Sequence, residues 1–166
     1  MELKDIAVLV PGRLNAHALE RIRAEFDCIE IASGDPSLVT PEIAGKVRGI
    51  AAMTVISADL MQALPKLEIV ANFGVGYDAV DAGHAGANGI MVTNTPDVLT
   101  DEVADTTIGL LLNTVRELSA SEAYMPAGHW TGKGNYRLTP LTMRGRTAGI
   151  HGMGRIGQAI TRWIYP

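Results

Sequence analysis

The sequence predicts an α/β fold built on a doubly wound parallel sheet, and three observations predict it. Short, almost wholly apolar runs recur through the first part of the chain, and stretches with apolar residues at helical spacing follow them. A glycine-rich turn of the form G-x-G-x-x-G stands near the end of the chain. Wholly apolar runs suit strands that are covered on both faces, and right-handed crossovers place helices on both sides of such a sheet.

The alternation of strand and helix can be followed along the chain, and it repeats five times. Thr40 and Ser57 are predicted to cap the second and third helices, because short hydroxyl side chains satisfy free N–H groups there. The predicted strands cover residues 6–10, 28–32, 49–55, 67–73 and 90–94. The predicted helices cover residues 18–26, 41–47, 58–64 and a segment that begins after residue 78 and ends near residue 88.

The alternation of short strands and helices ends at Thr100. Thr100 is predicted to cap a helix, and Asp101 and Glu102 follow in the first turn, where the helix dipole favours acidic side chains. A wide apolar stripe predicts that this helix continues to Tyr124, a length of roughly 37 Å at 1.5 Å per residue. That length exceeds the edge of a small sheet, so we predict a bridge between two lobes or a dimer face. A loop over residues 126–140 follows.

The glycine turn near the end of the chain favours a dinucleotide site. A strand over residues 147–151 is predicted to lead into Gly152, Gly154 and Gly157, and a helix-forming run follows. In dinucleotide-binding turns these glycines permit a tight turn, close approach of a pyrophosphate, and close helix–strand packing. The helix N-terminus then faces the phosphates. The alternative is a strand–helix turn without a ligand, and the acidic residue that would hold the ribose is expected beyond Pro166.

A second glycine turn covers residues 72–78, with the sequence Asn-Phe-Gly-Val-Gly-Tyr-Asp. It lies where a parallel strand reaches the carboxyl edge of the sheet, the edge at which open α/β sheets bind ligands. The two glycines let backbone N–H groups face outward, so a carboxylate or a phosphate could be held there. An ordinary strand–helix turn explains the same residues, and from these residues alone it is the better interpretation.

The composition argues against several classes of partner. The net charge of −4 is unlike that of a general nucleic-acid binder, which carries a basic face. The one cysteine, Cys28, permits no internal disulfide, fits a reducing compartment, and is predicted to be a buried, inert thiol. No apolar run is long enough to span a bilayer, and the N-terminus lacks the pattern of a signal peptide. We therefore expect no nucleic acid, no membrane and a cytoplasmic location.

Candidate metal ligands and catalytic groups are few. Asp101 and Asp105 lie one helical turn apart and could in principle hold a metal ion, but helix capping and a solvated face explain them more simply. The histidines pair with no carboxylate or cysteine at metal-ligand or charge-relay spacing; they are His17, His84, His129 and His151. We therefore expect no metal site and no complete catalytic apparatus in this chain.

Three stretches, taken together, resemble a known family. They are residues 70–81 (VANFGVGYDAVD), 92–105 (VTNTPDVLTDEVAD) and 149–157 (GIHGMGRIG). In this order and spacing they resemble the D-isomer-specific 2-hydroxyacid dehydrogenase family, and its glyoxylate/hydroxypyruvate reductases most of all. The resemblance covers essentially the whole chain.

The resemblance implies a division into two domains. Residues 1–98 would form a flavodoxin-like substrate domain, and residues 99–166 would begin a Rossmann NAD(P)-binding domain that is truncated here. The helix over residues 100–124 would cross between the domains and form a homodimer in the intact protein.

The resemblance also implies the site residues. The backbone amides of Val75 and Gly76 would hold the carboxylate of a small 2-oxo or 2-hydroxy acid, and Met53 and Thr54 would lie near this substrate. The cofactor would be NAD or NADP. The residues expected to contact it are Thr100, Gly152, Gly154, Arg155, Ile156 and Gly157.

The departures from the family pattern bear on activity. The family's arginine, which orients the carbonyl, and its glutamate and histidine, which supply the proton, would lie beyond residue 166, so no catalytic residue is expected in this chain. The chain would be the N-terminal part of an oxidoreductase that transfers hydride between NAD(P)H and a glyoxylate-type acid, and alone it would be inactive. The family's returning C-terminal helix is missing as well, and His151 replaces an aliphatic residue. The alternative is a non-catalytic, dehydrogenase-like binding or scaffold module.

Overall fold

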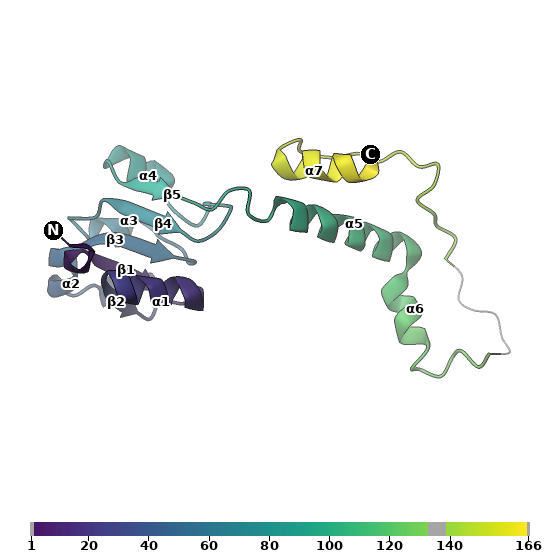
Figure 1. Cartoon of the computed structure of the whole chain (residues 1–166), viewed down its shortest axis with the longest axis horizontal. Helices are drawn as coiled ribbons and strands as arrows, with labels where there is room; N and C mark the ends of the chain where they lie inside the picture. Colours follow the sequence, from purple (N-terminus) through teal and green to yellow (C-terminus); the bar gives the residue numbers. More distant parts are fainter. Residues whose placement is uncertain (1, 133–138, 166) are drawn as a thin grey trace. The chain divides into compact units, whose positions relative to one another are not determined.

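A computed structural model describes residues 2–132 and 139–165 of the chain. The chain divides into two compact units, Met1–Val98 (unit 1) and Leu99–Pro166 (unit 2), which can be followed in Figure 1. Unit 1 contains a five-stranded sheet, and the described residues of unit 2 form three helices.

The sheet of unit 1 is parallel throughout, with the strand order β2-β1-β3-β4-β5. Its strands are β1 (Ala7–Pro11), β2 (Asp27–Ile31), β3 (Val47–Ala52), β4 (Ile69–Asn72) and β5 (Met91–Thr93). Each predicted strand of this region is therefore present within a few residues of its expected bounds. The parallel order with intervening helices confirms the predicted α/β class.

Helices connect consecutive strands of unit 1. They are α1 (Ala16–Glu25), α2 (Pro41–Lys46), α3 (Ala58–Gln62) and α4 (Ala82–Ala87), with the short 3₁₀ helices η1 (Leu3–Asp5) and η2 (Pro36–Leu38). Both predicted caps are confirmed. The Thr40 hydroxyl accepts a hydrogen bond from the N–H of Ile43 at 3.3 Å, and the Ser57 hydroxyl accepts one from Leu60 at 3.2 Å.

The hydrophobic core of unit 1 contains one face of the sheet. Leu9, Ile50 and Val70, from three adjacent strands, are at most 1% exposed and belong to one cluster with the fully buried Leu60 of α3. Burial of a leucine or isoleucine side chain stabilises a fold by about 1.5–3 kcal/mol. This core holds the strands in register, so the loops that follow β3, β4 and β5 leave the sheet at one edge.

Unit 2 contains α5 (Thr100–Arg116), α6 (Leu118–Tyr124) and α7 (Arg155–Ile164). Small buried residues, Ala104 of α5 and Ala159 of α7, let these two helices approach closely. The indole N–H of Trp163 donates to a carboxylate oxygen of Asp105 at 2.8 Å. No helix within residues 2–132 and 139–165 combines the length and apolar character that a bilayer span requires.

The prediction of one helix from Thr100 to Tyr124 is wrong. Glu117 adopts a left-handed conformation (φ 51°, ψ 41°) that ends α5 at Arg116, and α6 begins with the next residue. The side-chain oxygen of Asn113 accepts the N–H of Ser119 at 2.9 Å, so a side chain takes the place of a backbone carbonyl at the break. Asparagine side chains compete with helical backbone bonds in this way.

Two smaller predictions in unit 2 are also wrong. Thr100 does not cap α5, because Thr100 is already helical and the first helical hydrogen bond runs from the N–H of Val103 to the carbonyl of Leu99. Leu99 is therefore the N-cap, and it makes no side-chain cap bond. Residues 147–151 are not a strand. A strand needs a hydrogen-bonded neighbour, and the described residues of unit 2 contain no strand that could pair with this segment.

Candidate functional site

The glycine turn of unit 1 begins at the carboxyl end of β4. The N–H of Phe73 donates to the carbonyl of Ala52 in β3 at 2.8 Å, and beyond this bond the chain leaves the sheet. Residues 74–78 belong to no helix or strand, and most of them are exposed. The turn therefore projects from the sheet edge at which open α/β sheets bind ligands.

All three carbonyl groups at the centre of this turn accept hydrogen bonds. The side-chain nitrogen of Asn72 donates to the carbonyl of Gly76 at 2.8 Å and to that of Gly74 at 3.3 Å. The side-chain nitrogen of Asn94 donates to the carbonyl of Val75 at 2.7 Å. The conformation of the turn is thus fixed by side chains from the ends of two neighbouring strands.

In contrast to the carbonyls, two N–H groups of the same turn make no hydrogen bond within the described part of the chain. Those of Val75 and Gly76 are engaged by no atom of the described residues, and both residues are exposed. A Cβ atom at Gly76 would lie 3.2 Å from a carboxylate oxygen of Asp78, and one at Gly74 would lie 3.3 Å from the Asn72 nitrogen, so glycine keeps the turn tight at both positions. Two neighbouring free N–H groups on a fixed turn suit a carboxylate or a phosphate oxygen.

Met53 and Thr54 leave the sheet at the same edge. Ala52 of β3 is the register partner of Asn72 of β4, so the chain beyond each residue emerges at the same level. The side chain of Met53 is 53% exposed, and Thr54 is half-buried. The structure therefore brings the four predicted substrate residues of unit 1 to one sheet edge.

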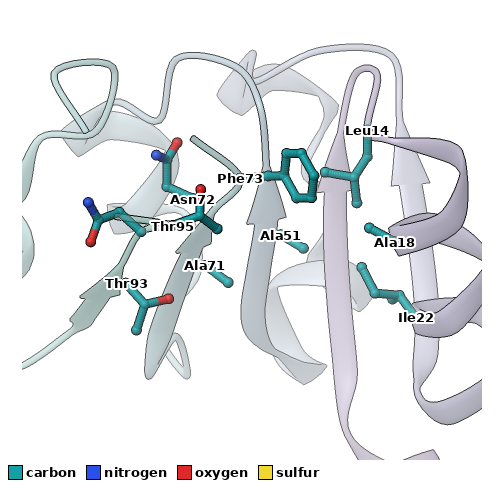
Figure 2. Close-up of a pocket in the computed structure, with 10 residues that line it drawn as sticks. Leu14, Ala18, Ile22, Ala51, Ala71, Asn72, Phe73, Thr93 and Thr95 are labelled. Carbon is teal, nitrogen blue, oxygen red and sulfur yellow. The ribbon is translucent and has the colours of Figure 1, made fainter. Parts of the chain in front are cut away.

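A hydrophobic cavity of about 220 Å³ lies beside the turn. Figure 2 shows Leu14 and Ala18 on one side of it and the strand residues Ala51 and Ala71 on the other, with Asn72 at its polar end. None of the residues that line the cavity is charged. A carboxylate would lose its hydration there without a compensating charge, so the free N–H groups of the turn are the better anion site.

The glycine turn of unit 2 is held by its glycine backbone and by the side-chain nitrogen of Gln158, which donates to the carbonyl of Met153 at 3.2 Å. Gly152 has φ 93°, a left-handed value that favours glycine, and Gly154 is the N-cap of α7. A Cβ atom at Gly157 would collide with the carbonyl oxygen of Gly152, so only glycine lets helix and turn pack at this distance. The N–H groups of Gly154 and Ile156 are engaged by no atom of the described residues. These donors stand at the positive end of a ten-residue helix.

The remaining predicted cofactor residues lie at the N-termini of α5 and α7, the two packed helices of unit 2. Arg155 and Ile156 form the first turn of α7, and both are exposed. Thr100 is the first residue of α5 and is half-buried. The structure thus collects the glycine turn and the start of α7 in one segment, with Thr100 on the neighbouring helix.

Metal-ligating and titratable groups do not gather at either turn. Within residues 2–132 and 139–165, no group of three or more histidine, cysteine, aspartate or glutamate side chains could hold a metal ion. Burial raises the pKa of the Cys28 thiol, but this residue is only half-buried, so the prediction of a buried thiol is wrong. The side-chain hydrogen bond from Arg48 holds the pKa of Glu68 below its usual value. Both groups lie outside the turn of unit 1.

Asn72 and Asn94 hold the first turn, although the sequence pattern alone gave neither a role of its own. Each is a polar residue at the carboxyl end of an apolar strand, and the two strands are neighbours in the sheet. Polar residues at neighbouring carboxyl ends are brought together by any parallel sheet, and this signal was present in the sequence.

The fold and the two turns define an α/β protein of the dehydrogenase type, and the comparisons agree. The family model described as "D-isomer specific 2-hydroxyacid dehydrogenase, catalytic domain" matches residues 7–162. The chain belongs to the D-isomer specific 2-hydroxyacid dehydrogenase family.

Several similar relatives and solved structures are glyoxylate or hydroxypyruvate reductases. The chain is 36% identical over 163 residues to glyoxylate/hydroxypyruvate reductase A HPR2 of Arabidopsis thaliana, covering 96% of this chain and 51% of that protein. It is 36% identical to the glyoxylate reductase of Thermococcus onnurineus, covering 93% and 49%. The crystal structure of the NADPH-dependent glyoxylate/hydroxypyruvate reductase of Sinorhizobium meliloti, in complex with NADP and malonate, matches with 52% identity and a TM-score of 0.90, covering 96% and 50%. The chain spans about half the length of the curated relatives it matches.

Proposed function

We propose that this chain is the N-terminal part of an NAD(P)-dependent reductase of small 2-oxo acids, of the glyoxylate or hydroxypyruvate type. The observation that carries the proposal is the pair of free N–H groups at Val75 and Gly76 on a fixed, exposed turn. Such a pair can bind the two oxygens of a carboxylate, which every 2-oxo acid carries. The family membership and the relatives named as glyoxylate reductases support the choice of substrate.

In this proposal unit 1 is the substrate domain, and the chain's own residues do the binding there. Val75 and Gly76 would hold the carboxylate, and Met53 and Thr54 would line the substrate at the same sheet edge. Holding the acid by its carboxylate orients the neighbouring carbonyl, which is the group to be reduced. The cytoplasm, a reducing compartment, suits the single thiol of Cys28.

Unit 2 would begin the cofactor domain, and NADP is the cofactor we propose, because it is bound in the Sinorhizobium structure. The turn fits a pyrophosphate: no atom lies within 4 Å of the Cβ position at Gly152 or Gly154, and the N–H groups of Gly154 and Ile156 are open. Arg155 is the first residue of α7 and can approach a phosphate, and Thr100 is the first residue of α5, which packs beside α7. When bound, the nicotinamide would supply the hydride for reduction.

The chain by itself should have no turnover. The family's arginine, glutamate and histidine have no counterpart in these 166 residues, so binding would be retained and proton transfer would be missing. Sustained oxidation of NADPH by the purified chain in the presence of glyoxylate would contradict this part of the proposal.

We also propose that α5 and α6 contribute to a homodimer of the intact protein. Their exposed apolar side chains include Leu110, Leu112 and Leu118, which are 61%, 42% and 53% exposed. Several large, exposed apolar side chains on consecutive helices support a surface that a partner covers. Analytical ultracentrifugation of the wild type and of a Leu110→Glu variant would test this, and equal masses at all concentrations would contradict it.

The carboxylate site can be tested by titration of the ¹⁵N-labelled chain with glyoxylate, followed by amide NMR spectra. We expect the signals of Val75 and Gly76 to shift in a saturable way, whereas glycolaldehyde, which lacks the carboxylate, should leave them unchanged. A parallel titration with NADP⁺ should shift Gly154 and Ile156 in unit 2. Shifts spread evenly over the surface, or equal responses to glyoxylate and glycolaldehyde, would contradict the proposal.

A further inference from the structure

The side chains of two asparagines determine where the N–H groups of the unit 1 turn point. In a planar trans peptide, the C=O of one residue and the N–H of the next lie on opposite sides of the chain. The carbonyl of Gly74 and the N–H of Val75 therefore form one rigid plane, and the carbonyl of Val75 and the N–H of Gly76 form the next. Whatever holds these carbonyls also aims the two N–H groups.

The first of these peptide planes is held from two sides. The carbonyl of Gly74 accepts the backbone N–H of Thr95 at 2.9 Å and the side-chain nitrogen of Asn72 at 3.3 Å. The same Asn72 nitrogen donates at 2.8 Å to the carbonyl of Gly76, which closes the turn behind the two N–H groups. The N–H of Val75 is therefore directed away from the sheet.

The second plane, with the Val75 carbonyl and the Gly76 N–H, is fixed by one hydrogen bond. The carbonyl of Val75 accepts the side-chain nitrogen of Asn94 at 2.7 Å, and within the described residues no other group donates to it. Asn94 follows β5, so its side chain reaches across from the neighbouring strand. The direction of the Gly76 N–H thus depends on one side chain that lies nineteen residues away from Val75 in the sequence.

The burial of Asn72 supports a positioning role. Asn72 is 7% exposed, and burial of an amide is costly unless its hydrogen bonds are made. Its nitrogen carries two N–H groups, and each has a carbonyl acceptor in the turn. An apolar residue would end the buried strand at lower cost, but it would leave both carbonyls without this donor.

We propose that Asn72 and Asn94 are positioning residues that hold the two N–H groups of the turn in place for a substrate carboxylate. This inference rests on the proposed function of the same turn. Asn72 acts on the plane that carries the Val75 N–H and on the Gly76 carbonyl that follows, and Asn94 acts on the plane that carries the Gly76 N–H.

The test is a glyoxylate titration of ¹⁵N-labelled Asn94→Ala, Asn72→Ala and a matched control, Asn88→Ala. The side-chain nitrogen of Asn88 also donates to a backbone carbonyl in the same unit, that of His84, at 2.8 Å, but within the described residues its side chain makes no hydrogen bond to the turn. We expect each variant at the turn to weaken glyoxylate binding about threefold to tenfold, the effect of one net hydrogen bond. The control should bind glyoxylate as tightly as the wild type.

The pattern of the NMR response separates positioning from a general loss of structure. In Asn94→Ala the Gly76 signal should lose most of its shift on binding, while Val75, still held through Thr95, should keep its shift. Thermal unfolding of each variant shows whether Asn72→Ala remains folded; if it does not, Asn94→Ala, at a half-buried position, decides the question.

Two different failures can be told apart. If wild-type Val75 and Gly76 do not respond to glyoxylate, the proposed function is overturned, and this inference is overturned with it. If the wild type responds and folded Asn94→Ala binds equally tightly with the same shifts, the carboxylate site stands and the role of the asparagines is overturned.

Discussion

The two glycine turns of this chain expose backbone N–H groups by different means. In unit 1 the turn is held by side chains, because Asn72 and Asn94 donate to its carbonyls from two strands. In unit 2 the turn is held within its own segment, through the left-handed φ of Gly152, the absent side chain of Gly157 and a hydrogen bond from the Gln158 side chain to the Met153 carbonyl at 3.2 Å. The first arrangement depends on the surrounding sheet, whereas the second is local to one segment. Variants should therefore affect the two units by different mechanisms.

The largest expected difference lies in packing. Leu60→Ala should destabilise unit 1 by about 2–5 kcal/mol, because a leucine that is fully buried leaves a cavity. Leu141→Ala is the matched control in unit 2, outside the proposed dimer surface: this residue is 40% exposed, so the expected change is within about 0.5 kcal/mol. Urea unfolding, followed through the amide NMR signals of each unit, measures both. Equal losses would mean that Leu141 is covered in solution, and the contrast between the units would then fail.

The next largest effect tests how the unit 2 turn is held. Gly157→Ala should destabilise unit 2 by about 1–3 kcal/mol, because the new Cβ would collide with the Gly152 carbonyl. Gly154→Ala is the control, since nothing lies within 4 Å of a Cβ at that position. Trp130 and Trp163 are the two tryptophans of the chain and both belong to unit 2, so tryptophan fluorescence reports its unfolding. If both variants unfold alike, glycine is not required at Gly157 for steric reasons.

The fold of unit 1 could be predicted from the sequence because every apolar run there finds a strand partner within the same unit. In unit 2 the same reasoning failed for residues 147–151, whose pattern suits a strand but which have no paired neighbour among the described residues. The helix break at Glu117 was missed for a related reason. Helical periodicity continues across it, and the deciding contact is between the side chain of Asn113 and Ser119.

The candidate sites divide in the same way. Glycine spacing predicts both turns, because each turn has positions where a side chain would be strained or crowded. The side chains that fix the first turn are not all close to it in sequence: Asn94 donates a hydrogen bond to the Val75 carbonyl, nineteen residues away. Sequence spacing alone does not pair them, and only the strand order, with β4 beside β5, brings them together.

A smaller effect sharpens the contrast in unit 2. Gly109 lies inside α5, and no atom lies within 4 Å of the position that a Cβ at this residue would take. Gly109→Ala should therefore stabilise unit 2 by about 0.5–1 kcal/mol, since alanine loses less backbone entropy than glycine in a helix. Tryptophan fluorescence during urea unfolding measures the gain. A loss of stability instead would indicate that another part of the protein packs against α5 at this glycine.

The smallest expected effect is a pH dependence confined to unit 1. Arg48 donates to both carboxylate oxygens of Glu68, at 2.8 and 3.0 Å, and this hydrogen bonding holds the pKa of Glu68 below its usual value. A carboxyl group whose pKa is lowered by folding stabilises the fold above its unfolded pKa, about 4.3 for glutamate. That contribution is lost as the pH falls through the lower folded value. Thermal unfolding of Glu68→Gln should therefore show a weaker loss of stability on acidification than the wild type. Because Glu68 is exposed, the difference should be small and should shrink further in high salt, and identical pH profiles would show that the pair contributes nothing.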